Sequence, residues 1–284
     1  MPDLATIGAA LGWAQAETRD RESAPLAAQV LLARLLDVPR SWILAHPEAP
    51  FAASLAAEFA QRIGRLAAGE PLAYLTGEQE FYGLAFAVSP TVLIPRPETE
   101  LLVNAARARL EALGSLARLR VADVGTGSGC IAVALAVNLR GLTLLATEID
   151  PGALRAAKVN AQRHGVADRI RFVRTDLIAA LAPGLDLVCA NLPYIPTRAL
   201  ADLAVARHEP QRALDGGADG LDPIRRLLAQ AQERMNPGGL LLFEIEETHG
   251  GAVWALAQET FAHATLALHK DLAGRERLLR IDLS

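Results

Sequence analysis

The spacing of hydrophobic positions changes character along the chain. In the first 75 residues, apolar side chains recur at helical spacing in three stretches, Leu4–Ala16, Leu26–Leu36 and Phe51–Leu66. Prolines at positions 25, 39, 47 and 50 separate these stretches as helix starts and breaks. The pattern predicts a small helical bundle over residues 1–75 that contains no catalytic constellation. Such a module suits a lid or a substrate-recognition domain.

Residues 76–94 have a different pattern. Bulky apolar residues alternate with other residues around two glycines, in the order Gly77, Phe81, Gly83, Leu84, Phe86 and Val88. This spacing predicts a short β-hairpin, which we expect to connect two domains. A helix is expected next, from Arg96 to about Leu113, because Pro97 suits the first helical position and acidic residues follow in the first turn.

The remainder of the chain, within an expected domain of residues 95–284, alternates between buried-strand and helical patterns. Strands are expected at 119–125, 142–150, 169–176, 185–194 and 239–246, and helices at 128–139, 151–165, 221–239 and 250–261. This alternation favours an α/β fold with a parallel, doubly wound sheet. The last two strands, 264–271 and 275–283, leave no room for a crossover helix, so one of them is expected to be antiparallel.

Composition narrows the class of protein. The chain has 284 residues, of which 51% are hydrophobic, so one large domain or a domain of about 190 residues plus a small one can form. It contains no apolar run long enough to cross a membrane, and its first 20 residues lack a basic leader. With only Cys130 and Cys189 present, no disulfide framework is indicated. We therefore expect a cytoplasmic protein without a membrane association.

Charge and histidine content point away from two classes of function. The net charge of −4 gives no general attraction to nucleic acid. The six histidines are scattered along the sequence, and no two of them stand at ligand spacing. We therefore expect neither direct nucleic-acid binding nor a metal site.

A glycine-rich segment joins the first strand of the alternating region to the helix after it. Its sequence is Asp123-Val-Gly-Thr-Gly-Ser-Gly129, with Gly125, Thr126, Gly127, Ser128 and Gly129 in the turn. Glycines allow a tight turn and the close approach of a ligand to a helix N-terminus. The spacing is G-x-G-x-G with an acid two residues earlier, which differs from the dinucleotide fingerprint G-x-G-x-x-G. A nicotinamide dehydrogenase is therefore disfavoured.

Acidic residues end the next two strands. Glu148 follows the glycines by about 20 residues, where a carboxylate can accept hydrogen bonds from both hydroxyls of a ribose. This combination is similar to the S-adenosylmethionine site of class I methyltransferases. By that resemblance, Asp176 receives the adenine amino group and Leu177 lies against the ring. Asp150 is the weaker rival of Glu148, because it is expected to cap the helix that starts at Pro151.

The fourth expected strand ends in Asn191-Leu192-Pro193-Tyr194. Ligands in open α/β sheets bind beyond the carboxyl ends of the strands, so this tetrapeptide is expected to face the methyl group of the cofactor. It resembles the Asn-Pro-Pro-Tyr motif of methyltransferases that act on planar amide or amine nitrogens. The Asn191 side-chain oxygen and the Pro193 carbonyl can each accept one N–H of the acceptor, while Tyr194 packs on the planar group.

Longer motifs resemble one family more specifically. They are GEPLAYLTG at 69–77 with Phe81-Tyr82-Gly83, VLIPRPETELLV at 92–103, Arg207-His-Glu-Pro210, and GGADG at 216–220. Together they are similar to the PrmC/HemK family of protein-(glutamine-N5) methyltransferases, and the resemblance covers nearly the whole chain.

This resemblance implies a fold and an activity. The fold is a class I S-adenosylmethionine-dependent methyltransferase, with a Rossmann-like seven-stranded sheet and a small N-terminal helical bundle. The activity is transfer of a methyl group to the glutamine of the Gly-Gly-Gln loop of class 1 peptide chain release factors, with S-adenosyl-L-homocysteine as the second product. The glycine loop and Glu148 hold the cofactor, the segment from Asn191 to Tyr194 holds the glutamine, and Asn191 lies near both ligands. Arg96, Pro97 and Glu100 are expected to help shape the site.

One residue of the tetrapeptide Asn191 to Tyr194, the acceptor motif, leaves an alternative open. The second position is Leu192 where the family usually has proline, and leucine restores a backbone N–H and relaxes φ. The spelling Asn-Leu-Pro-Tyr also resembles ribosomal RNA adenine dimethyltransferases, so an N6-adenine methyltransferase that acts on RNA or DNA is the rival interpretation. The intact Asn191 and Tyr194 argue against a non-catalytic cofactor-binding subunit. Nothing in the sequence demands an oligomer, so we expect a monomer.

Overall fold

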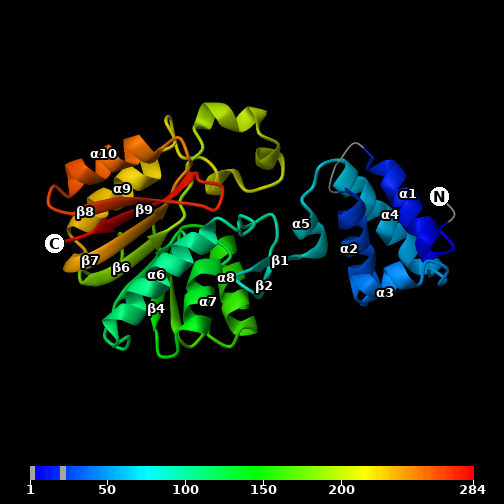
Figure 1. The fold of residues 1–284 in the computed structure, drawn as a ribbon, viewed down its shortest axis with the longest axis horizontal. Coiled ribbons are helices and arrows are strands. Elements are labelled where there is room, and N and C mark those ends of the chain that lie inside the picture. The colour runs from blue at the N-terminus through cyan, green and yellow to red at the C-terminus, as the bar shows by residue number, and fades with distance from the viewer. Residues whose placement is uncertain (1–3, 20–23) are drawn as a thin grey trace. The chain divides into compact units, whose positions relative to one another are not determined.

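The computed structural model describes residues 4–19 and 24–284 (Figure 1). Residues 1–3 and 20–23 of the expected helical domain therefore lie outside the described residues. The chain folds into two compact units, Met1–Glu78 and Gln79–Ser284. Within the described ranges, no helix combines the length and the apolar character that crossing a lipid bilayer requires.

The first unit is helical, as the apolar spacing predicts. Its helices are α1 (Ile7–Glu17), α2 (Ala24–Leu36), α3 (Arg40–Ala45), α4 (Ala53–Ala67) and α5 (Leu72–Thr76). Side chains such as Ile7, Leu31, Phe59 and Ile63 are fully buried in its core. The short helices α3 and α5 were not predicted. Each starts directly after a proline and is too short to show a periodic pattern.

A β-hairpin follows, formed by β1 (Glu78–Phe81) and β2 (Leu84–Ala87). Its two-residue turn consists of Tyr82 and Gly83, whose φ angles are 55° and 71°. Two consecutive positive φ angles match the twist of a tight hairpin. The tyrosine is held there because its backbone N–H donates to Glu100 Oε1 at 2.9 Å.

A seven-stranded sheet forms the centre of the second unit. Its strands are β3 (Val121–Val124), β4 (Leu144–Glu148), β5 (Ile170–Arg174), β6 (Leu185–Ala190), β7 (Met235–Glu244), β8 (Thr265–Lys270) and β9 (Glu276–Asp282). The order across the sheet is β5-β4-β3-β6-β7-β9-β8. Strands β3 to β7 pair in parallel, and β9 runs antiparallel to both β7 and β8. This arrangement confirms the expected class I methyltransferase fold, including the antiparallel strand.

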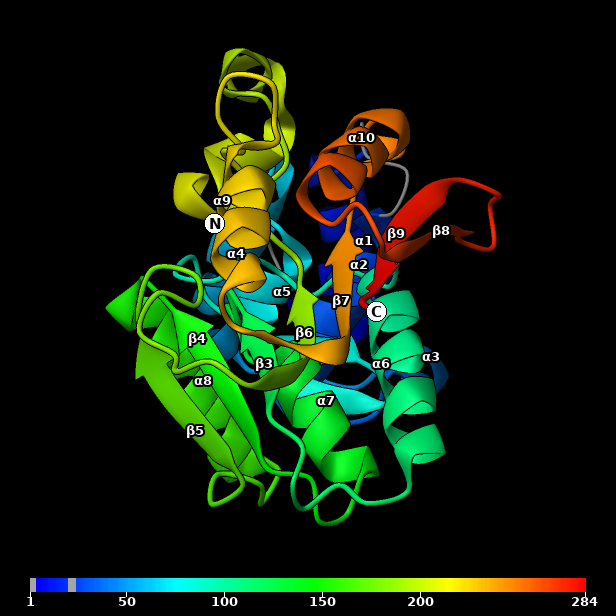
Figure 2. The same cartoon turned by 90° about the vertical axis from the view of Figure 1, so that its left-hand side faces the viewer.

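Helices cover both faces of this sheet. Helices α6 (Thr99–Leu113), α7 (Cys130–Asn138) and α8 (Pro151–Arg163) lie on one face, and α9 (Asp222–Gln232) and α10 (Gly250–Thr260) lie on the other (Figures 1 and 2). The central strands are buried from both sides, and β3 has no exposed residue. The chain leaves β3 toward β4 and returns past it to β6, so the strand order reverses at β3. Ligands bind at such a switch point.

Several predicted boundaries were wrong, including the end of the strand expected at 185–194, which lies at Ala190. The helix expected at 221–239 ends at Gln232, and β7 already begins at Met235. The backbone N–H of Leu185 donates to the Arg234 carbonyl, and the register between β6 and β7 then shifts, so residues 236–239 form an irregular strand start. Helix α6 begins at Thr99 instead of residue 96. The segment after β6 also contains three short 3-10 helices, at Thr197–Asp202, Ala204–Arg207 and Gln211–Ala213, that were not predicted.

Candidate active site

The residues selected from the sequence lie at the carboxyl ends of four neighbouring strands. The glycine loop follows β3, Glu148 ends β4, Asp176 and Leu177 follow β5, and Asn191 to Tyr194 follow β6. Because β5, β4, β3 and β6 are adjacent in that order, these segments share one edge of the sheet. The fold therefore brings together groups that are as far apart in sequence as residues 125 and 194.

The loop after β3 needs its glycines. Gly125, Gly127 and Gly129 have φ angles of 70°, 55° and 83°, in the left-handed region that side chains disfavour. A Cβ at position 129 would also lie 3.1 Å from Ala157 of α8, so the third glycine allows α7 and α8 to pack closely. The N–H groups of Gly125 and Thr126 both donate to the Thr147 carbonyl at 2.9 Å, which fixes the loop on β4.

Glu148 is held beside this loop by backbone donors. Its Oε2 accepts from Gly127 N at 3.1 Å, and its Oε1 accepts from Ile149 N at 2.8 Å and Asp150 N at 2.9 Å. Oε1 already accepts two hydrogen bonds, whereas Oε2 accepts one and keeps a lone pair for a further donor. Asp150 accepts instead from Gly152 N and Ala153 N of α8, so its predicted capping role is confirmed.

The end of β5 shows two features that bear on its predicted role. The Asp176 carboxylate forms an ion pair with Arg226 of α9, and both side chains are about half exposed. Leu177 has a φ of 53°, a strained conformation for leucine, of a kind that clusters at functional sites. The neighbouring Ile149 is an apolar side chain with 43% exposure, which sequence reasoning missed. The sequence feature that could have identified it is its position directly after Glu148, the acidic residue that ends β4.

Asp123 supports the loop from below and is almost fully buried. Its Oδ2 accepts from Thr126 Oγ1 at 2.5 Å and from Ala132 N at 3.1 Å. Its Oδ1 has no hydrogen-bond partner among the described residues. Burial raises the pKa of this carboxyl to about 7, against the lowering effect of its two donors.

Asn191, the first residue of the acceptor motif, begins a hydrogen-bonded series of three polar side chains. Its Nδ2 donates to Thr99 Oγ1 at 3.1 Å, and Thr99 Oγ1 donates to Glu244 Oε2 at 2.5 Å. Thr99 and Glu244 are buried, at the start of α6 and the end of β7. Both were missed from the sequence, where a threonine in a first turn and an acid in a strand give no sign that they meet.

The other two side chains of the motif differ in their surroundings. Leu192 is 4% exposed and belongs to the hydrophobic core, where it packs against Gly125: a Cβ at position 125 would lie 3.1 Å from Leu192 Cδ2. Tyr194 is half-buried, and burial together with the nearby Glu244 carboxylate raises the pKa of its phenol to about 12. A Cβ at Gly220 would collide with the Tyr194 carbonyl oxygen, so the glycine-rich segment 216–220 packs directly on the motif.

The loop before α6 is tied to the segment after the motif. Arg96 forms an ion pair with Glu209, whose side chain is 2% exposed and whose Oε2 accepts from Ile94 N at 3.0 Å. Glu209 was not selected as a site residue, although it stands in the Arg-His-Glu-Pro stretch of residues 207–210. Glu100, expected to shape the site, binds the hairpin turn through Tyr82 N.

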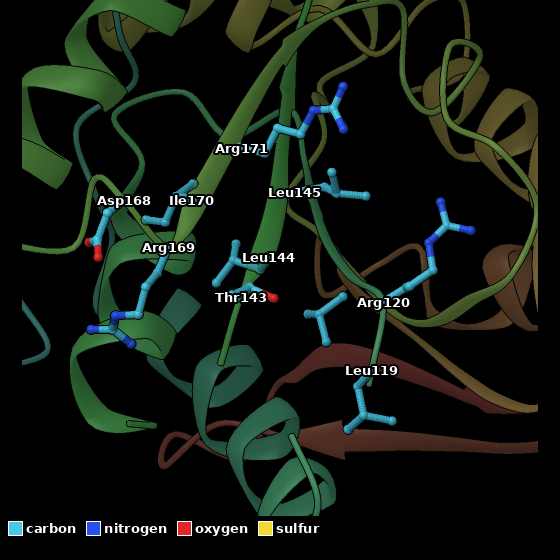
Figure 3. Close-up of a pocket in the computed structure, with 10 residues that line it drawn as sticks. Leu119, Arg120, Thr143, Leu144, Leu145, Asp168, Arg169, Ile170 and Arg171 are labelled. Carbon is cyan, nitrogen blue, oxygen red and sulfur yellow. The ribbon is translucent and has the colours of Figure 1, made fainter. Parts of the chain in front are cut away.

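Open hollows lie in the surface of the second unit. One, of about 540 Å³, is lined by residues at the amino ends of β3, β4 and β5, on the edge of the sheet opposite to the candidate site (Figure 3). There the guanidinium groups of Arg120 and Arg169 point away from each other (Figure 3). Another, of about 580 Å³, includes Thr197 and Asp215 of the segment that follows the acceptor motif, and Arg226 of α9. This second hollow is the one that adjoins the candidate site.

Two family models match parts of the chain. The family described as PrmC N-terminal domain matches residues 9–77, and the family described as ribosomal protein L11 methyltransferase matches residues 105–214. Among solved structures, the catalytic domain of human METTL16 superposes with a TM-score of 0.56 at 18% identity, over 78% of this chain and 82% of that one. A methyltransferase from Pyrococcus furiosus gives 0.52 at 18% identity, over 79% and 98%. These two likenesses show the methyltransferase fold.

Curated relatives are much more similar. The release factor glutamine methyltransferase of Moorella thermoacetica is 46% identical over 254 residues, which cover 89% of this chain and 89% of that protein. The one from Koribacter versatilis is 42% identical over 234 residues, or 81% of each chain. With identity of this level across both units, the chain belongs to the release factor glutamine methyltransferase family.

Proposed function

We propose that this protein transfers a methyl group from S-adenosyl-L-methionine to the side-chain amide nitrogen, N5, of the glutamine in the Gly-Gly-Gln motif of class 1 peptide chain release factors. The observation that carries the proposal is the position of Asn191. Its amide follows β6 at the strand-order reversal, next to the glycine loop after β3, in a chain of this family.

The residues around the glycine loop suit the cofactor. Three left-handed glycines leave the loop backbone open, Glu148 keeps a lone pair on Oε2 for the ribose, and the exposed Ile149 offers an apolar surface for adenine. We assign Thr126, Ser128, Asp176 and Leu177 to the same pocket, with Asp176 as acceptor of the adenine amino group. When bound, S-adenosyl-L-methionine supplies an electrophilic methyl group on a sulfonium.

The acceptor motif suits an amide nucleophile. An amide nitrogen is a poor nucleophile because its lone pair is delocalised into the carbonyl. Asn191 Oδ1 and the Pro193 carbonyl accept the two N–H groups, hold the nitrogen in line with the methyl group and stabilise the positive charge that develops on it. The proton then leaves the methylated nitrogen without a strong base, because that nitrogen has become acidic. Tyr194 walls the pocket against water, and its raised pKa keeps the phenol neutral.

Leu192 takes part through its backbone. Its side chain fills the core against Gly125, so the substitution of the usual proline costs the acceptor site no side-chain contact. The rigidity that proline gives to φ is supplied by packing in this chain.

The helical unit serves as the substrate-recognition domain in this proposal. We assign it to residues 1–75, with residues 76–94 as a hairpin connector and 95–284 as the catalytic domain. The match of residues 9–77 to the PrmC N-terminal domain supports this division. The protein acts as a monomer on a protein substrate, without direct nucleic-acid contact, in the cytoplasm.

Mass spectrometry tests the proposal. The purified protein is incubated with S-adenosyl-L-methionine and a class 1 release factor, and the Gly-Gly-Gln peptide is analysed for a gain of one methyl group. A release factor in which that glutamine is replaced by asparagine serves as the control. Methylation of adenine in ribosomal RNA without any gain on the release factor would overturn the proposal in favour of the adenine methyltransferase.

A further inference from the structure

Three polar side chains, two of them buried, form a hydrogen-bonded series that begins at Asn191 of the acceptor motif. Asn191 Nδ2 is 3.1 Å from Thr99 Oγ1, which is 2.5 Å from Glu244 Oε2. Thr99 is 1% exposed and Glu244 is 4% exposed, so water has little access to either group. The three residues come from the segment after β6, the first turn of α6 and the end of β7.

The chemistry of the three groups gives the series a direction. A carboxylate can only accept, so the Thr99 hydroxyl must donate its one proton to Glu244. The threonine oxygen is then left with lone pairs, and the asparagine must turn its N–H group toward it. The side-chain oxygen of Asn191, Oδ1, consequently faces away from Thr99. An asparagine amide by itself has no such preference, because its two ends are nearly the same size.

We infer that Thr99 and Glu244 are positioning residues, which fix the Asn191 side chain with Oδ1 toward the substrate amide and Nδ2 away from it. The inference rests on the proposed function and deepens it. With the amide reversed, an N–H group of Asn191 would face an N–H group of the glutamine, and the acceptor would be lost. Neither residue touches the reacting atoms.

The protonation state of Glu244 controls this direction. Burial raises the pKa of its carboxyl to about 7; Glu98 raises it further, while Thr99, Arg277 and Asn191 oppose the shift. Burial raises the pKa of the Tyr194 phenol and of the Cys130 thiol to about 12, and the negative charge of Glu244 adds to both shifts. Both groups therefore stay neutral near pH 7. A protonated Glu244 can donate to Thr99, which then donates to Asn191 and reverses the amide.

Substitutions at Thr99 test the inference. Thr99→Val keeps the shape and removes the hydroxyl, and it should lower kcat for release-factor methylation by about 10- to 100-fold while the Kd for S-adenosyl-L-methionine stays within about twofold. Thr99→Ser restores the hydroxyl and should recover most of the rate. Thr260→Val is the matched control, because Thr260 Oγ1 donates to the Leu256 carbonyl within α10, away from the acceptor motif.

The pH profile of kcat tests whether protonation of Glu244 reverses the Asn191 amide. The wild-type kcat should fall about tenfold per pH unit below pH 7, because one protonation of Glu244 removes the acceptor. In Glu244→Gln this inflection should disappear, whereas Glu246→Gln, two residues beyond the end of the same strand, should keep it. A Thr99→Val variant with wild-type kcat, or an inflection that persists in Glu244→Gln, would overturn the inference. If the wild-type protein itself fails to methylate the release factor, the proposed function fails instead.

Discussion

The side-chain amide of Asn160 is hydrogen-bonded to both the backbone N–H and the backbone carbonyl of Ala87. On α8, Asn160 Oδ1 accepts from Ala87 N at 2.7 Å, and Nδ2 donates to Ala87 O at 3.0 Å. The same Nδ2 donates to Ser128 O at 2.8 Å. One fully buried amide therefore links the end of β2 to the glycine loop.

Removal of this amide should weaken folding and cofactor binding together. Asn160→Ala leaves three backbone groups without partners, which should reduce the free energy of unfolding by about 2–4 kcal/mol. Asn160→Asp keeps the shape but cannot donate to either carbonyl, so it should be destabilising too. Urea unfolding and calorimetric titration with S-adenosyl-L-methionine measure both effects. Asn138→Asp is the control, since Asn138 donates to the Ala134 carbonyl in its own helix.

Asn191→Ala should impair the chemical step far more than binding. It removes the oxygen that is proposed to accept an N–H of the glutamine, so turnover should fall about 100-fold or more. Single-turnover methylation of a release factor measures the step directly, and the Kd of the cofactor should change little. Turnover near the wild-type value would refute the role assigned to this residue.

Glu148→Gln should act mainly on cofactor affinity. The carboxylate is held by three backbone N–H groups and is proposed to accept from the ribose hydroxyls, and the neutral amide is a weaker acceptor. Loss of charged hydrogen bonds predicts a Kd about 10- to 100-fold higher by calorimetry. Glu259→Gln, on the exposed side of α10, should bind normally. An unchanged Kd in Glu148→Gln would place the ribose elsewhere.

Because Asp176 is proposed to accept the adenine amino group, its ion pair with Arg226 should compete with adenine for the same carboxylate. Asp176→Asn should weaken cofactor binding, whereas Arg226→Ala frees the carboxylate and should tighten it, by at most about fivefold because the pair is half exposed. Arg225→Ala, whose side chain pairs with Asp219 and Asp222, is the neighbouring control. Weaker binding in Arg226→Ala would show instead that the arginine itself supports the cofactor.

Stability should depend on pH through Asp123. Its folded-state pKa is raised to about 7, so the folded protein binds more protons than the unfolded chain between about pH 4 and 7. The contribution of this group is therefore largest at low pH and is lost as the pH rises toward 7. Asp123→Asn removes the titration, so its unfolding free energy should fall less than that of the wild type between pH 5 and 8, by about 1–3 kcal/mol. Asp168→Asn, which is exposed, should follow the wild type.

The sequence by itself determined the alternation of elements, the parallel sheet with an antiparallel strand, and the segments that end four of its strands. These features follow from local patterns: apolar periodicity, glycines at a tight turn, and polar residues directly after buried strands. The longer motifs also indicated the family, which the curated relatives confirm.

Tertiary structure alone decided which side chains support the site. Thr99 and Glu244 are 145 residues apart, and Asn160 meets Ala87 across 73 residues, distances that no local pattern can span. A polar residue can be identified from the sequence when it stands in a local motif. A buried hydrogen bond between distant residues depends instead on which strands and helices lie side by side in the fold. The fold brings those elements together at the switch point of the sheet, and desolvation there gives Asp123 and Glu244 pKa values that their sequence positions do not reveal.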